Sequence, residues 1–245
     1  MSGRQTSREG NGAAIEAVPT IFVIDPDGST RDALQELASS IGCRCRAYAS
    51  AGEFFASYVD SGPACLVLEV NVPDVNGLQI QRRLARAGDP LPLVYLTAHR
   101  DVWLAVELMR GGAVHYLSKP LPRLTMVSAV QEALALDRAR RGAQRRRQRA
   151  LDRLQALTPR ERQALQMIAE GKSNKQVADA LRITLRAAEL RRANLMKKLG
   201  LKCPMSLAIF AMRAKREGVL TADGSQGGQP SRTATSIGQG VAGLL

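Results

Sequence analysis

Four side chains that suit phosphoryl chemistry each follow a short apolar run of the sequence. The run "TIFVID" ends at Asp25, "ACLVLE" at Glu69, "PLVYLT" at Thr97 and "VHYLSK" at Lys119. Carboxylates hold Mg²⁺ or accept a phosphoryl group, while hydroxyl and ammonium groups bind its oxygens. A further carboxylate, Asp27, lies two residues beyond Asp25. These residue types indicate one pocket, provided that the fold brings the ends of the runs together.

The alternation of elements predicts such a fold between residues 19 and 136. Five strand-like runs alternate with amphipathic segments, three of which begin with capping residues at Ser29, Ser50 and Asp101. This order predicts an α/β domain with a doubly wound, parallel, five-stranded sheet. Such sheets bind ligands at the carboxyl ends of their strands, where the four side chains would meet.

The net charge of +13 is concentrated in the second half of the 245 residues. Residues 19–123 contain 10 basic and 11 acidic side chains, whereas residues 124–220 contain 22 basic and 8 acidic ones. This asymmetry indicates a polyanionic partner, most simply nucleic acid. Eight arginines crowd into residues 138–153, where we expect a solvated linker helix that Gly142 kinks or frays. Backbone contacts to DNA and a dimer seam remain alternative roles for this helix.

Several features of the sequence indicate the cellular compartment of the protein. No apolar run is long enough to span a bilayer, and the N-terminus lacks an apolar leader, so we expect a cytoplasmic protein without a membrane partner. Cys43, Cys45 and Cys65 lie in strand-like runs, and Cys203 is distant. We interpret the first three as reduced core thiols, with a redox or metal site as the less favoured alternative.

Residues 154–220 read as four short helices. The predicted caps are Thr158, with Glu161 closing a capping box, then Ser173 and Thr184. Two helices joined by a tight turn at 182–183, the second strongly basic, indicate a helix-turn-helix unit. On this second helix we expect an inward face and an outward face, formed respectively by Leu190, Ala193 and Leu199 and by Arg186, Glu189, Arg192 and Lys197.

Residues 20–136 resemble a response-regulator receiver domain, most closely the FixJ-type branch. The stretch "LTAHRDVWLAVELMRGGAVHYLSKP" and the V-P-D-x-x-G turn after the third run carry the resemblance. It implies a conformational switch in which Thr97 and Tyr116 report on the phosphoryl site. It also implies a cis bond between Lys119 and Pro120, and it aligns Glu69 with the phospho-acceptor aspartate.

Residues 154–220 resemble the LuxR-type, four-helix DNA-binding domain through "LTPRERQ", "IAEGKSNKQVADAL" and "RRANLMKKLG". The resemblance implies that the helix 185–198 enters the major groove and that the last helix mediates dimerisation. The family's Pro, Thr, Val and His become Leu185, Ala187, Ala188 and Arg191, so we expect an altered site preference with DNA binding retained. The candidate DNA-binding residues are Lys175, Arg186, Glu189, Arg191, Arg192, Lys197 and Lys198.

Two departures from the receiver pattern affect its chemistry. Pro26 replaces the second aspartate of the acidic pair and offers no metal ligand. Glu69 moves its carboxylate by about 1.5 Å, a C–C bond length, when misplacement by about 1 Å can cost roughly 10²-fold in rate. We therefore expect no cofactor, impaired Mg²⁺ binding and regulation without phosphorylation. Glu69 then serves as a built-in activating charge or as a plug that pairs with Lys119.

Two alternatives stay open: an ordinary phosphorylation-dependent regulator, and a pseudo-receiver controlled by a protein or ligand. The expected partners are double-stranded promoter DNA and a second copy of the chain. RNA polymerase and a sensor kinase are further candidates. The predicted organisation is a disordered tail (1–18), a receiver (19–136), an arginine-rich linker (137–153), a DNA-binding domain (154–220) and a second disordered tail (221–245).

Overall fold

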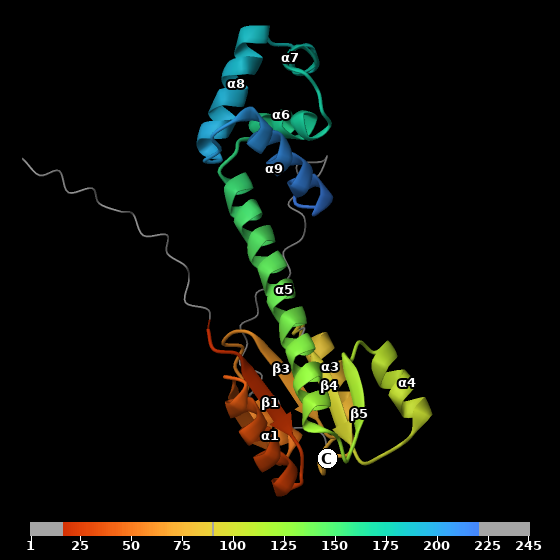
Figure 1. Ribbon diagram of the computed structural model, residues 1–245. Helices are drawn as coiled ribbons and strands as arrows, with labels where there is room; N and C mark the ends of the chain where they lie inside the picture. Colours follow the sequence, from red (N-terminus) through yellow and green to blue (C-terminus); the bar gives the residue numbers. More distant parts are fainter. Residues whose placement is uncertain (1–16, 90, 221–245) are drawn as a thin grey trace, which may run out of the picture. The chain divides into compact units, whose positions relative to one another are not determined.

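The structure, a computed structural model, describes residues 17–89 and 91–220. The chain divides into two compact units, the first ending at Arg138 and the second beginning at Ala139 (Figure 1). The predicted disordered tails lie outside the described residues, apart from residues 17 and 18.

The first unit contains a five-stranded sheet in which every neighbouring pair of strands is parallel. The strand order β2-β1-β3-β4-β5 reverses direction after β1, so the predicted doubly wound sheet is confirmed. The strands are β1 (Thr20–Ile24), β2 (Arg44–Tyr48), β3 (Ala64–Leu68), β4 (Leu93–Thr97) and β5 (His115–Ser118).

Helices cover both faces of this sheet. One core joins Phe22 and Tyr95 to side chains of the helices α2 to α4, and the other joins Val23 and Val94 to α1 and α5. The second core also contains the buried Cys65, with Cys43 and Cys45 packed beside it as free thiols. The helices are α1 (Gly28–Ser40), α2 (Ala51–Ser57), α3 (Gly77–Arg86), α4 (Val102–Arg110) and α5 (Arg123–Gln155).

Three local expectations need correction or refinement. Asp27, and not Ser29, caps α1, because its carboxylate accepts hydrogen bonds from the backbone N–H groups of Ser29 and Thr30. The helix α5 runs through Gly142 without a break. Asp137, expected at the start of the linker, is fully buried and accepts a hydrogen bond of 2.9 Å from the backbone N–H of Ala64.

The second unit has the predicted four helices, and their predicted caps Thr158, Ser173 and Thr184 are confirmed. The turn between α7 and α8 contains Arg182 at a φ of 51°, in the left-handed region. Leu154, from the end of α5, joins the core of this unit. The helices are α6 (Pro159–Ala169), α7 (Asn174–Leu181), α8 (Leu185–Lys198) and α9 (Pro204–Arg216).

The predicted inward face of α8 is only partly right. Leu199 is buried, but Leu190 is 63% exposed and Ala193 is exposed as well. The buried positions are Ala188, Leu195 and Leu199. Because each residue turns the helix by about 100°, Leu190 lies on nearly the opposite side from Ala188. No helix in the described part of the chain is both long and apolar enough to cross a membrane.

Candidate functional site

Lys119 bridges two carboxylates at the carboxyl ends of the strands. Its Nζ lies 2.6 Å from Oδ2 of Asp25 and 3.2 Å from Oε2 of Glu69. Both acids are buried, with 2% and 8% of their surface exposed. Burial alone would lower the pKa of Lys119, but the hydrogen bond and charge of Asp25, followed by those of Glu69, leave this pKa raised. We call these three residues the Lys119 cluster.

The remaining oxygens of the two acids are also occupied by local donors. Oδ1 of Asp25 accepts a hydrogen bond of 2.9 Å from the backbone N–H of Asp27. Oε1 of Glu69 accepts one of 2.8 Å from the backbone N–H of Val70. A buried carboxylate needs such partners to offset its desolvation. The Lys119 cluster therefore balances much of its own charge.

Asp27 lies close to this cluster in the sequence, but its carboxylate caps the N-terminus of α1. Side-chain hydrogen bonds from Thr30 and then Ser29 lower the pKa of Asp27 to about 2. Pro26 has no side-chain ligand, and Asp25 is held by Lys119. Within residues 17–89 and 91–220, no three His, Cys, Asp or Glu side chains are grouped to hold a metal ion. In this pocket, Lys119 pairs with both buried acids, Asp25 and Glu69.

Thr97 and Tyr116 meet at the backbone of His99. The hydroxyl of the buried Thr97 accepts a hydrogen bond of 3.1 Å from the N–H of His99, and Tyr116 donates one of 2.8 Å to its carbonyl. The amide of Asn71, two residues beyond Glu69, lies 3.1–3.2 Å from the ring nitrogens of His99. Sequence reasoning missed this role of His99, although the residue stands in the T-x-H part of the receiver motif.

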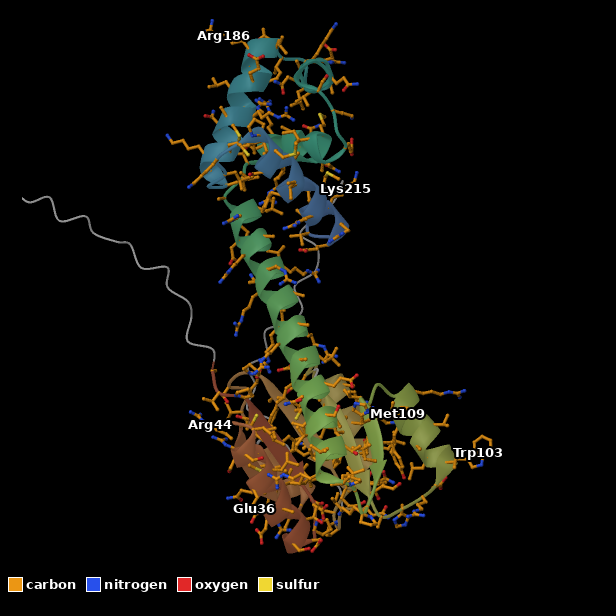
Figure 2. All side chains as sticks on the ribbon, in the orientation of Figure 1. Glu36, Arg44, Trp103, Met109, Arg186 and Lys215 are labelled. Carbon is orange, nitrogen blue, oxygen red and sulfur yellow. The ribbon has the colours of Figure 1, made fainter. Side chains whose placement is uncertain are left out.

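The helix α8 displays much of the predicted DNA-binding set. Arg186, labelled in Figure 2, is exposed together with Glu189 and Lys197, and Lys175 is exposed on α7. Arg191 is half-buried. Exposed lysines can contact DNA phosphates in proteins, and an exposed arginine can also contact a base edge.

Two of the predicted residues also have structural contacts. Arg192 is half-buried, and its Nη1 donates a hydrogen bond of 2.9 Å to the side chain of Asn174, linking α8 to α7. Lys198 lies 2.9 Å from Oε2 of Glu161, and this contact is the main cause that lowers the pKa of Glu161. The structure therefore ties these two side chains into the fold of the second unit.

Comparison with protein families gives two matches. Residues 21–131 match the response regulator receiver domain, and residues 155–211 match the LuxR family of bacterial regulatory proteins. Both matches agree with the resemblances drawn from the motifs.

Similar full-length proteins combine the same two parts of the chain. The transcriptional regulatory protein TdiR of Thauera aromatica is 34% identical, over 85% of this chain and 89% of that protein. Nodulation protein W of Bradyrhizobium diazoefficiens is 37% identical, over 81% and 88%. Among solved structures, the response regulator StyR is 32% identical and matches 80% of this chain and all of its own, with a TM-score of 0.72.

Proposed function

The chain belongs to the response regulators that join a receiver domain to a LuxR-type DNA-binding domain, and we propose that its receiver regulates transcription without being phosphorylated. Members of this family are DNA-binding transcription regulators, and their conventional input is a phosphoryl group from a sensor kinase. Pro26 and Glu69 argue against that input for this chain.

The observation that carries the proposal is the sharing of Lys119 between Asp25 and Glu69. The cation that would bind the oxygens of an incoming phosphoryl group is already bound by two carboxylates. Phosphorylation would convert the Glu69 carboxylate into an acyl phosphate and so replace one negative charge by about 1.5 to 2 at neutral pH. Because Pro26 supplies no ligand for a metal ion, the added charge would be neutralised poorly beside Asp25, which already pairs with Lys119. Like charges in a buried site repel one another, and this repulsion disfavours phosphorylation. The misplacement of the Glu69 carboxylate disfavours it further.

Of the two roles for Glu69, we favour the built-in activating charge. The Thr97 hydroxyl accepts a hydrogen bond from the N–H of His99. Glu69 can therefore influence this part of the receiver through His99, without a direct hydrogen bond to Thr97. A connected route leads from the Glu69 carboxylate through the backbone of Val70 to Asn71, and from the Asn71 amide to His99. The carbonyl of His99 accepts a hydrogen bond from Tyr116. This route therefore joins the Glu69 carboxylate to Tyr116, the proposed switch residue.

The test compares two isosteric substitutions in the full chain. We expect Glu69→Gln to weaken DNA binding by about 5–150-fold, the range of typical coupling between two sites. The matched control is Glu36→Gln on α1, an exposed acid labelled in Figure 2. DNA selected from a random pool serves as the ligand. Equal affinity of the two variants would remove the activating role and leave Glu69 as a plug.

Dimeric binding to a two-fold site is the second part of the proposal. Met205, Ile209 and Met212 are 68%, 44% and 60% exposed on α9. Their spacing of four and three residues places them on one face of the helix. An exposed apolar stripe of this kind fits a second copy of α9, in line with the dimerising role that the resemblance implies. Contact with RNA polymerase stays a prediction.

A partner-controlled receiver is the second candidate, and the exposure of α4 favours it. Val102 and Trp103 are 73% and 85% exposed, and Figure 2 shows Trp103 and Met109 on this helix. Apolar side chains gathered on one exposed helix indicate an interaction site. A pull-down with the full chain tests this candidate. Partner binding that persists in Glu69→Ala but is lost in Tyr116→Ala would support it over the activating charge.

A further inference from the structure

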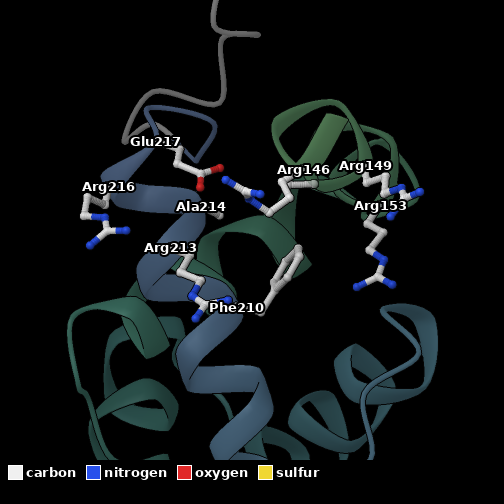
Figure 3. Close-up of a pocket in the computed structure, with 9 residues that line it drawn as sticks. Arg146, Arg149, Arg153, Phe210, Arg213, Ala214, Arg216 and Glu217 are labelled. Atoms are coloured by element: carbon white, nitrogen blue, oxygen red, sulfur yellow. The ribbon is translucent and has the colours of Figure 1, made fainter. Parts of the chain in front are cut away.

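Within the second unit, a cavity of about 530 Å³ lies between the end of α5 and α9 (Figure 3). Small-molecule sites in proteins have volumes of about 300–1,000 Å³. The cavity is lined by Arg146, Arg149, Ala150, Arg153, Phe210, Arg213, Ala214, Arg216 and Glu217. Five arginines and a single acidic residue therefore contribute to the wall of this cavity.

These five arginines differ from other cations of the same unit. Lys172, Lys198 and Lys215 each form an ion pair with a glutamate. Within residues 17–89 and 91–220, the side chains of the five arginines form no ion pair or hydrogen bond. Like charges that face one cavity repel one another, so a bound polyanion would relieve an unfavourable interaction. The planar fork of each guanidinium matches the oxygens of a phosphate.

An aromatic ring adds a second recognition element. Figure 3 shows Phe210 between the arginines of α5 and Arg213 of α9. The ring is half-buried and packs against the core of this unit, so its position is fixed. Ala150 and Ala214 form small parts of the wall that leave room beside it. A planar base can stack on such a ring while its phosphates bind the surrounding cations.

The position of the cavity argues against duplex DNA as its occupant. Figure 2 shows Arg186, at the start of α8, well apart from Lys215, which lies on α9 between the cavity residues Ala214 and Arg216. A base contact made by Arg186 therefore does not involve this cavity. A concave site of limited volume also suits a small ligand better than a phosphate backbone.

We propose that this cavity binds a nucleotide carrying two or more phosphate groups, with the phosphates among the arginines and the base on Phe210. The bound nucleotide would connect α5 to α9 inside the second unit. A ligand that binds only the folded form stabilises it, so the nucleotide would also raise the unfolding temperature of this unit.

The experiment measures binding to the full chain by calorimetry at about 0.15 M salt, where weak surface attraction is screened. The probes are ATP, GTP, adenosine and inorganic triphosphate. We expect at least one of the two nucleotides to bind, adenosine not to bind, and inorganic triphosphate to bind more weakly than that nucleotide. The absence of binding by both nucleotides would overturn the proposal. Equal binding of the nucleotide and inorganic triphosphate, together with no effect of Phe210→Ala, would also overturn it.

A pair of double variants separates the cavity from general basic charge. Arg149→Ala with Arg213→Ala removes two cavity arginines, and we expect it to weaken nucleotide binding about tenfold or more, as for the loss of one charge-assisted contact. Arg145→Ala with Arg147→Ala removes the same charge from exposed positions of α5 outside the cavity. We expect this control to leave nucleotide binding unchanged, and thermal unfolding verifies that both variants fold.

Two outcomes of this pair would contradict the site. Equal weakening of nucleotide binding by both variants would assign the binding to diffuse charge. A larger loss of duplex DNA affinity in the cavity variant than in the control would assign the cavity to the DNA backbone instead.

Discussion

At the carboxyl ends of the receiver strands, the Lys119 ammonium group pairs with two buried acids. By contrast, the five arginines that line the cavity between α5 and α9 form no ion pair with any residue in the described part of the chain. The two regions contain similar groups in different surroundings. A buried charge must be paired because its desolvation is costly, while an exposed arginine keeps its hydration and remains available. In the receiver, Lys119 therefore pairs with acids inside the protein, whereas the five cavity arginines of the second unit stay exposed to solvent.

This difference gives the two charged regions different expected sensitivities. Changes in the Lys119 cluster should affect the stability of the receiver first. Changes in the exposed cations of the second unit should affect binding and leave stability nearly unchanged. The following substitutions test this distinction, in order of decreasing effect.

Lys119→Met should have the largest effect. Breaking a buried ion pair typically costs about 3–5 kcal/mol. Here we expect the free energy of unfolding of the receiver to fall by about 2–4 kcal/mol. The lower range reflects the 22% exposure of the Lys119 side chain. Differential scanning calorimetry of the full chain separates the two units. Adding Glu69→Gln to this variant should restore part of the loss, because it removes one uncompensated charge.

The control for this prediction is Lys172→Met, which breaks the exposed pair with Glu170 in the second unit. Exposed pairs contribute at most about 1 kcal/mol. Equally small losses for Lys119→Met and Lys172→Met would show that the Lys119 cluster does not depend on its cation.

Arg186→Ala should have the next largest effect, on DNA recognition. We expect a loss of about 1–3 kcal/mol in binding and a relaxed preference at one base position, as for an arginine that contacts a guanine edge. Lys197→Ala should weaken binding to all sequences by a similar factor and reduce the salt slope by about 1. Affinities for selected and random DNA at several salt concentrations distinguish the two. Identical profiles would contradict the separation into base and phosphate contacts.

Asp27→Ala should have the smallest effect, a slightly lower unfolding temperature of the receiver from the lost cap of α1. The pKa of Asp27 is lowered from 3.8 to about 2 in the folded chain. A lowered pKa stabilises the fold above the unfolded value, and this contribution disappears as the pH falls through the folded value. The difference between wild type and variant should be complete above about pH 4 and shrink toward pH 2. A difference that does not change over this range would contradict the charged cap.

The sequence predicted the strands, most caps and the convergence of Asp25, Glu69 and Lys119, because these follow from apolar runs and parallel topology. It did not predict which way side chains point. Asp27 follows a proline and sits at the start of a helix, so it bonds to that helix. His99 contacts Thr97 and Tyr116 through its backbone, which carries no residue-specific signal, and Asn71 through its ring.

In the second unit too, the direction of side chains was harder to predict than the helices themselves. The caps of α6, α7 and α8 were predictable because capping depends on residues three apart. The exposed face of α8 was less predictable because a shift of two residues turns the helix by about 200°. Leu190 and Ala193 therefore face outward although they are apolar.

The central claim is that this receiver regulates DNA binding without a phosphoryl group. The most direct measurement incubates the full chain with acetyl phosphate and Mg²⁺, then records intact mass and affinity for selected DNA. The reference is the double variant Pro26→Asp with Glu69→Asp, which restores the acidic pair and the shorter acceptor. We predict that wild type gains no phosphoryl group and keeps its affinity, while the double variant is phosphorylated. Phosphorylated wild type with increased DNA affinity would contradict the claim.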